Sequence, residues 1–173
     1  KDGAAETIAK LKGLGIKKTV MLTGDNRKTA ETVATEIGID EVQAELLPEN
    51  KLFVIQKMQR EGRIVAFVGD GINDSPALAA ADTGIAMGGG TDVAVETSDV
   101  VLMRSNLESI PTAVKLAKRS MGVLQQNIAI AVGTVLLLLA GLFAGYIHMA
   151  SGMFIHEASI LVVILNAMRL LHR

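Results

Sequence analysis

The sequence contains no cysteine and no tryptophan, and aromatic residues make up only 3% of it. Without cysteine, the chain can form no disulfide bond, no thiolate nucleophile and no cysteine-based zinc site. The shortage of aromatic residues argues against base stacking as a main binding mode. Basic residues are not in excess either, because 17 Lys and Arg face 18 Asp and Glu. We therefore expect no nucleic-acid partner.

Charge is also nearly absent from the C-terminal part of the chain. After Arg119 the only Asp, Glu, Lys or Arg residues are Glu157, Arg169 and Arg173. The chain as a whole is 50% hydrophobic, which excludes an intrinsically disordered protein. The sequence therefore divides into a charged, soluble N-terminal part and an apolar C-terminal part.

The first residues, Lys1, Asp2 and Gly3, resemble neither a native start nor a signal peptide, because no initiator Met or apolar segment is present. Residues 4–11 are typical of a helix that is already under way, with no capping residue before it. We expect the sequence to be a piece of a longer protein. A processed mature chain is the alternative.

The N-terminal part alternates between strand-like and helix-like segments with short connections. This alternation predicts an α/β domain with a parallel sheet, in which ligands bind beyond the carboxyl ends of the strands. Helices are expected over residues 4–11, 27–37, 50–60, 75–81 and 92–96, and strands over residues 17–22, 41–46, 63–68, 83–87 and 100–103, with glycines 88–90 ending the fourth strand.

Polar residues follow two of the expected strands. Asp70 and Asp74 lie four residues apart in one strand-end loop, with Asn73 between them. Two carboxylates and a carboxamide offer the hard oxygen ligands that Mg²⁺ prefers. Gly69 and Gly71 would let the backbone approach a ligand closely. The loop therefore predicts a magnesium site, although such residues are also ordinary in turns.

The second strand-end loop offers groups that suit a phosphate. The Thr23 hydroxyl and the backbone N–H groups of Gly24 and Asp25 could hold phosphoryl oxygens. Lys51 opens a helix and supplies a compact positive charge for the same anion. We expect the two loops to converge on one crevice, and the chemistry that they imply is phosphoryl transfer.

Three runs of residues identify a family resemblance. They are Met-Leu-Thr-Gly-Asp at 21–25, Pro-Glu-Asn-Lys at 48–51 and Gly-Asp-Gly-Ile-Asn-Asp-Ser-Pro-Ala-Leu at 69–78. With them the chain resembles, over essentially its whole length, the C-terminal part of a heavy-metal-transporting P-type ATPase. The resemblance implies a phosphorylation domain of the haloacid dehalogenase fold, working with Mg²⁺ and ATP through an aspartyl-phosphate intermediate.

The resemblance also implies a role for each polar residue of the two loops. Asp70 would bind Mg²⁺, with Asn73 and Asp74 supporting the metal–phosphate site. Thr23 and Lys51 would bind the phosphoryl group. Asp25, which follows Gly24, would face the nucleotide-binding domain.

The family's phosphorylated aspartate lies in Asp-Lys-Thr-Gly-Thr, and this run does not occur in the sequence. The nucleotide-binding domain, which would bind most of the ATP, is missing as well. We therefore expect this chain alone to be inactive and to need the missing N-terminal part of the same pump. The alternatives are a membrane-anchored, non-catalytic module that binds phosphate and Mg²⁺, or the inactive product of a truncated gene.

The apolar part predicts a hairpin of two transmembrane helices. Residues 128–147 and 153–171 are each long enough to cross a hydrocarbon core of ~30 Å. Basic residues lie on one side of both spans, so the positive-inside rule places the α/β domain in the cytosol. We expect residues 1–106 to form the phosphorylation-domain portion, 107–127 a cytosolic stalk helix and 128–173 the hairpin in the lipid bilayer. Two buried core helices are the alternative.

Glu157 lies inside the second expected span, where a carboxylate is a candidate functional residue. His156 precedes it, and imidazole with carboxylate suits a divalent transition-metal ion, with Ser159 as a further oxygen ligand. Residues 156–160 resemble a variant of the His-Glu-Gly-Gly-Thr motif of the cobalt/zinc-type subgroup, in which Ala158 and Ile160 replace Gly and Thr. The alternative is a solvated pair at the outer membrane interface.

Two other metal classes are less favoured. The zinc/cadmium/lead subgroup usually relies on an Asp in this helix, and the second span has none. Cu(I) prefers thiolate and thioether ligands. Met149 and Met153 lie four residues apart, but such residues more often pack or face lipid.

Overall fold

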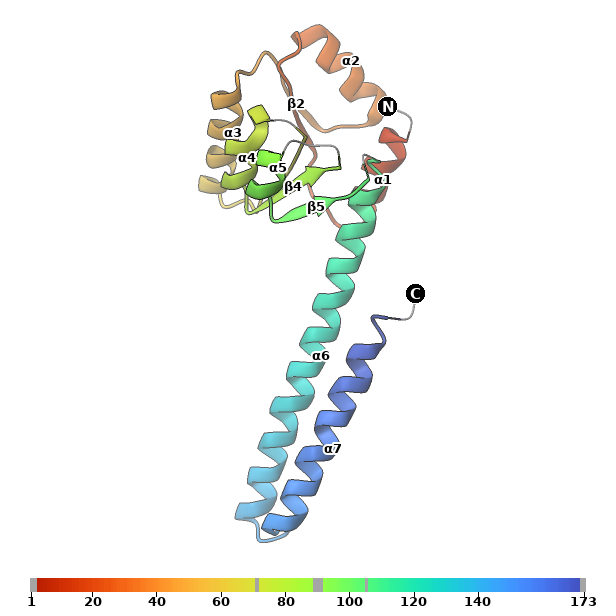
Figure 1. Cartoon of the computed structure of the whole chain (residues 1–173), viewed down its shortest axis with the longest axis vertical. Coiled ribbons are helices and arrows are strands. Elements are labelled where there is room, and N and C mark those ends of the chain that lie inside the picture. Colours follow the sequence, from red (N-terminus) through yellow and green to blue (C-terminus); the bar gives the residue numbers. More distant parts are fainter. Residues whose placement is uncertain (1–2, 71, 89–91, 105, 172–173) are drawn as a thin grey trace. The chain divides into compact units, whose positions relative to one another are not determined.

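The computed structural model describes residues 3–70, 72–88, 92–104 and 106–171. Chain contacts divide it into two units, Lys1–Val114 and Lys115–Arg173, and each is considered by itself (Figure 1). Several residues named in the sequence analysis lie outside the described ones: Lys1, Asp2, Gly71, Gly89, Gly90 and Arg173.

Helices and strands alternate through the first unit, as the sequence predicts. The helices are α1 (Ala4–Gly13), α2 (Arg27–Ile37), α3 (Pro48–Arg60), the short 3-10 helix η1 (Ile72–Asp74), α4 (Ser75–Ala80) and α5 (Asp92–Thr97). The strands are β1 (Val20–Leu22), β2 (Glu41–Gln43), β3 (Ala66–Gly69), β4 (Thr83–Met87) and β5 (Val100–Leu102).

The helix boundaries follow from capping chemistry. Asn26 caps α2, since its side-chain oxygen accepts a hydrogen bond from the Thr29 N–H at 2.9 Å. Gly38 ends the same helix in the left-handed conformation, at φ 78°. Pro48 occupies the first turn of α3, where its missing N–H has no helical partner to lose.

The strands form two parallel ladders. β1 pairs with β2, with Val20 opposite Glu41, and β4 lies between β3 and β5. No strand pairing among the described residues joins the two ladders. The parallel order confirms the expected α/β class, and it places the ends of β1 and β3, with the polar loops that follow them, at carboxyl edges of the ladders.

The core of this unit lies around β4 and β5. Ile85, Met87 and Leu102 are buried together with Ile110, the second residue of the helix that follows. α4 packs directly on β4, because a Cβ at Gly84 would lie only 2.4 Å from the Leu78 carbonyl oxygen. This packing holds α4, and with it the loop before it, against the sheet.

The second unit contains two long helices, most of α6 (Ser109–Phe143) and all of α7 (Met149–Met168), which lie side by side in Figure 1. Both are long and apolar enough to cross a membrane. Two hydrogen bonds from the Asn166 side-chain amide join them, to Asn127 Oδ1 at 2.9 Å and to Gln126 Oε1 at 3.2 Å. This pairing fixes the two helices as an antiparallel hairpin.

The helix ends differ from the expected spans. The first helix ends at Phe143, because Gly145 turns the chain at φ 75° and the N–H groups of Tyr146 and Ile147 both donate to the Gly141 carbonyl. Ile147 then packs over Gly141, where a Cβ would lie 2.4 Å from its Cδ1. The helix therefore ends four residues before the expected end of the span at residue 147.

The second helix begins earlier than expected. α7 starts at Met149 because the Ser151 hydroxyl accepts a hydrogen bond from the His148 N–H at 3.1 Å and donates one to the His148 carbonyl at 2.8 Å. It ends at Met168 rather than at residue 171. The division of the chain into phosphorylation domain, stalk and hairpin stays a prediction.

Candidate functional site

The loop after β1 is organised by its own side chains. The Thr23 hydroxyl donates a hydrogen bond to Asp25 Oδ2 at 2.9 Å and accepts one from the Asp25 N–H at 3.1 Å. Thr23 is half-buried and Asp25 is exposed. The turn brings the hydroxyl and the carboxylate together at the carboxyl end of the β1–β2 ladder.

The loop after β2 holds this turn in place through backbone hydrogen bonds. The Leu46 N–H donates to the Thr23 carbonyl at 3.0 Å, and the Glu45 N–H donates to the Asp25 carbonyl at 2.9 Å. Glu45 adopts φ 59°, the only positive value among the described residues other than glycine. Such a conformation costs a residue with a Cβ about 1 kcal/mol. The local cost is tolerated here because it aims two N–H groups at the loop that contains Thr23 and Asp25.

A second part of the site joins α3 to the loop after β3. Lys51 Nζ lies 2.7 Å from Asp74 Oδ1, and the side chains are only 18% and 13% exposed. Lys51 belongs to the first turn of α3, whereas Asp74 ends η1 and immediately precedes α4. The ion pair is half-buried, so water screens it less than a surface pair.

The close approach of β3 to Asp74 requires a glycine. A Cβ at Gly69 would lie 2.9 Å from the Cβ of Asp74 and 3.1 Å from its Oδ2. Ser75, the next residue, is buried, and its hydroxyl has no hydrogen-bond partner among the described residues. The loop is therefore packed tightly on its inner side, while Asp70 and Asn73 are exposed.

The oxygen ligands present fit magnesium. Mg²⁺ commonly binds one or two carboxylates and completes its shell with water and phosphate oxygens. Asp70 and Asp74 would supply the carboxylates, and Asn73 would add an amide oxygen nearby in the chain. The described residues contain no group of three or more His, Asp or Glu side chains that could enclose a metal ion by themselves.

The structure pairs the predicted residues in two sets. Thr23 contacts Asp25, and Lys51 contacts Asp74. Gly24 lies between the first two, and a Cβ on it would lie 3.4 Å from the Leu46 carbonyl oxygen. Among the residues that the structure describes, no hydrogen bond links the two sets, and the catalytic role of each residue stays a prediction.

The predicted metal ligands of the second unit lie along α7. His156 and Glu157 are both exposed, and as neighbours on a helix they point in different directions. The Ser159 hydroxyl donates to the His156 carbonyl at 2.7 Å. These three residues do not by themselves surround an ion, so their role also stays a prediction.

Sequence analysis missed three features. The left-handed Glu45 leaves no signal in the sequence, because glutamate is not a typical residue for that conformation. The pairing of Asn127 with Asn166 could have been suspected, since an amide in an apolar helix seeks a partner. The third is Arg119, whose guanidinium donates a hydrogen bond to the Arg169 carbonyl at the end of α7.

The start of β1 is fixed by a charged cluster outside the site. The Asp40 carboxylate accepts hydrogen bonds from Lys12 Nζ at 2.6 Å and from the Thr19 N–H and hydroxyl, both at 2.8 Å. The Lys12 ammonium and the two Thr19 donors together lower the pKa of Asp40 to about 2. Because Thr19 directly precedes β1, the cluster holds the strand that ends at the Thr23 turn.

Two family models match the chain, both described as haloacid dehalogenase-like hydrolase. One matches residues 1–82 and the other residues 51–114. Together they cover the first unit.

Relatives of similar sequence extend the match through both long helices. The chain is 42% identical to a cadmium-transporting ATPase of Staphylococcus aureus, over 99% of this chain and 24% of the relative. It is 45% identical to a zinc-transporting ATPase of Bacillus subtilis, over 97% and 26%. It is 47% identical to a manganese-exporting P-type ATPase of Mycobacterium leprae, over 97% and 23%. The chain thus spans about a quarter of the length of these curated relatives.

A solved structure matches equally well. The crystal structure of a zinc-transporting PIB-type ATPase in the E2.Pi state superimposes with a TM-score of 0.93 at 40% identity. The match covers 99% of this chain and 28% of that one.

Proposed function

Because the chain is homologous to the C-terminal region of heavy-metal-transporting P-type ATPases and has a haloacid dehalogenase-like domain, we propose that it is the C-terminal part of an ATP-driven metal exporter. The observation that supports this most is the half-buried pair of Lys51 and Asp74 beside the β3 end, within the Gly-Asp-Gly-Ile-Asn-Asp run. The proposed cargo is a divalent heavy-metal ion of the cobalt/zinc type.

In this proposal, the first unit handles the phosphoryl group. Thr23 and the N–H groups after it hold phosphoryl oxygens, and Lys51 neutralises their charge. Asp70 and Asp74, with Asn73 beside them, hold Mg²⁺, which when bound would offset the negative charge of the phosphate.

The remaining groups come from outside this chain. The phosphoryl group of ATP would pass to an aspartate in the part of the pump that this chain does not span, and water would later release it. The nucleotide would be bound mainly by that same part, with Asp25 facing it. We therefore expect no ATP hydrolysis by this chain alone.

The second unit would bind the transported ion. His156 and Glu157 provide an imidazole and a carboxylate, and Ser159 a hydroxyl. Because these residues do not enclose an ion, a further helix of the pump must contribute the remaining ligands. The protein would lie in the cell membrane, with its first unit in the cytosol.

The helix α6 offers a route for coupling the two reactions. It begins within the first unit and continues to Phe143 in the second, so one unbroken helix belongs to both. A change at the phosphorylation site could then reach the metal site through this helix.

Two measurements on membranes of the source cells test the proposal. An antibody against the first unit should detect a protein several times larger than 18.2 kDa. Purified from the same membranes, that protein should hydrolyse ATP faster when Co²⁺, Zn²⁺, Cd²⁺ or Mn²⁺ is added, and Cu⁺ serves as the control. A band at the size of this chain, or stimulation by Cu⁺ alone, would contradict the proposal.

A further inference from the structure

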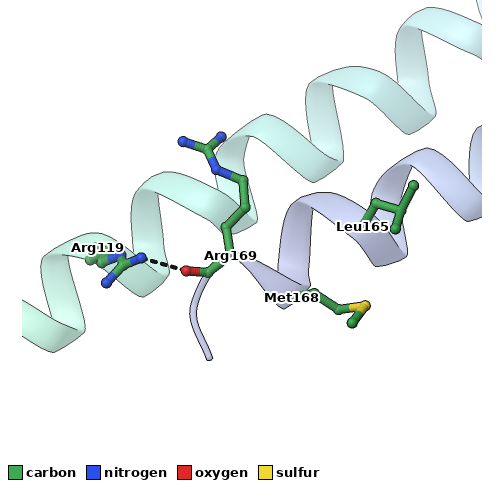
Figure 2. A pocket seen from close by; sticks show the side chains of 4 residues that line it. All are labelled: Arg119, Leu165, Met168 and Arg169. Carbon is green, nitrogen blue, oxygen red and sulfur yellow. Dashed lines mark hydrogen bonds between the residues drawn. The ribbon is translucent and has the colours of Figure 1, made fainter. Parts of the chain in front are cut away.

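A groove in the second unit lies where the end of α7 meets α6. It has a volume of about 420 Å³ and is lined by Arg119, Leu165, Met168 and Arg169 (Figure 2). We refer to it as the arginine groove. Nothing in the proposed transport cycle uses it.

The level of the groove along the hairpin is set by the amide contacts beside it. Asn166 bonds to Gln126 and Asn127 across the two helices, and these are the last amides before the uncharged stretch of α6. From Asn127 to Phe143 that stretch would span ~25 Å at 1.5 Å per residue, close to the thickness of a hydrocarbon core. Leu165 precedes Asn166 by one residue, and Met168 and Arg169 follow it by two and three, so the groove lies beside this contact. In a hairpin that spans a membrane, this position would be near the lipid headgroups.

Two arginines and two apolar residues line the groove, and its surface is mostly apolar. The guanidinium of Arg119 donates to the Arg169 carbonyl, and Arg169 Nη1 donates to Asn166 Oδ1 at 3.1 Å. A guanidinium has five donors in a planar fork, so each arginine can bind an anion while keeping its contact in the protein. Leu165 is 65% exposed and Met168 45% exposed, so both can contact an acyl chain.

We propose that the arginine groove binds one anionic phospholipid of the cytosolic leaflet. The phosphate would lie against the two guanidinium groups, and the first acyl methylene groups would cover Leu165 and Met168. The inference rests on the proposed function in one respect, namely that α6 and α7 span a membrane.

Charge and apolarity together favour a lipid over other occupants. Basic pockets between transmembrane helices on the cytosolic side recognise anionic headgroups, because the phosphate is attracted while the acyl chain stays in hydrocarbon. A free phosphate ion would gain nothing from the leucine and the methionine. A zwitterionic lipid would bring a second, positive group towards the arginines and bind less tightly.

Native mass spectrometry of the full-length protein in detergent tests the proposal, with phosphatidylglycerol and phosphatidylcholine as the added lipids. We expect one phosphatidylglycerol molecule to bind at concentrations at which phosphatidylcholine does not. Arg169→Gln should weaken this binding by about fivefold, the effect of one basic residue near a headgroup. Lys115→Gln is the matched control: it removes one positive charge from an exposed position of α6 outside the groove and should leave the binding unchanged.

Three results would overturn the proposal. The wild-type protein could show no preference for phosphatidylglycerol, as it would if another helix of the pump filled the groove. Lys115→Gln could lower binding as much as Arg169→Gln, which would indicate general attraction only. Millimolar inorganic phosphate could displace the lipid, which would indicate a free-anion site.

The measurement needs neither ATP nor a transported metal. If the lipid fails to bind while metal ions still stimulate ATP hydrolysis, only the lipid site is lost and the proposed function remains. If metal ions do not stimulate ATP hydrolysis while the lipid still binds, the proposed function is lost and the lipid site remains.

Discussion

Lys51 Nζ and Asp74 Oδ1 lie 2.7 Å apart, although 23 residues separate them in the chain. The contact joins the first turn of α3 to the 3-10 helix after β3. It therefore aligns two of the three motifs that resemble the phosphorylation domain. A cation and a carboxylate placed together at the end of a strand can share one phosphate and one Mg²⁺ between them.

Replacing Lys51 should affect both stability and phosphate binding. In Lys51→Met, the Asp74 carboxylate loses its partner while it stays half-buried, at a cost of about 1–2 kcal/mol of folding free energy. Phosphorylation of the full-length protein by inorganic phosphate should fall sharply. Lys57→Met, at an exposed position of the same helix, is the control and should change neither. Normal phosphorylation of the Lys51 variant would remove this residue from the phosphate site.

Gly69→Ala should distort the loop that contains Asp74. The added Cβ would lie 2.9 Å from the Asp74 Cβ and 3.2 Å from the Phe67 ring, so one of the neighbours must move. Overpacking of this kind costs about 1–3 kcal/mol. Gly13→Ala, which meets nothing within 4 Å, is the matched control. Thermal unfolding of both variants measures this effect. Equal melting temperatures would contradict the prediction, because they would show that the loop accommodates the added Cβ at no cost in stability.

The conformation of Glu45 predicts an unusual order of variants. Glu45→Gly should keep the loop intact, because glycine adopts φ 59° without steric cost. Glu45→Val should destabilise it by about 1–2 kcal/mol, because a β-branched residue strongly resists that conformation. We expect phosphorylation by inorganic phosphate to be retained in the glycine variant and weakened in the valine variant. If phosphorylation by inorganic phosphate changes equally in both variants, the effect comes from loss of the Glu45 carboxylate and not from the backbone conformation.

The Asp40 cluster predicts a loss of stability at acid pH. The pKa of Asp40 is about 2 in the folded protein, below its ordinary value of 3.8, because of Lys12 and Thr19. The folded state thus favours the carboxylate, and the stabilisation is complete above about pH 4 and disappears as the pH falls towards 2.

Unfolding by denaturant at a series of pH values between 2 and 6 measures this effect. In Asp40→Asn the carboxylate is absent, so the difference in stability from the wild-type protein should shrink as the pH falls. A difference that stays constant over this range would show that the cluster does not titrate as proposed.

Glu157→Ala should separate metal binding from phosphorylation. The variant loses the proposed carboxylate ligand in the expected membrane span, so metal-stimulated ATP hydrolysis by the full-length protein should disappear. Phosphorylation by inorganic phosphate, which involves the first unit, should persist. Unchanged metal stimulation would remove Glu157 from the transport site.

Local chemistry made parts of the fold predictable. Helix α2 has the bounds expected from its sequence, since Asn26 and Gly38 mark both of its ends. Strand β4 also has its expected bounds, residues 83–87, because glycine follows it. By contrast, the strand expected over residues 41–46 ends at Gln43, where the chain turns towards the left-handed Glu45. No residue of a type that is common in turns predicts this change of direction.

The candidate site was predictable in its residues and not in its contacts. Polar residues after buried strands reveal which side chains can meet, because parallel strands share a carboxyl edge. Which of these side chains pair depends on how α3 packs beside η1. This packing is a tertiary contact that the local sequence does not reveal. The ends of the membrane spans were hidden for a related reason: the apolar run continues past Phe143, and only the turn at Gly145 ends the helix.

The hairpin of α6 and α7 is closed at both ends. At one end Arg119 of α6 donates a hydrogen bond to the carbonyl of Arg169, just after α7, and at the other end Ile147 of the connecting turn lies against both Gly141 of α6 and Gly152 of α7. Two helices clasped in this way cannot slide past each other by a turn without breaking both contacts. A displacement of α6 along its axis would therefore move α7 with it, and His156 and Glu157 would shift together with α7.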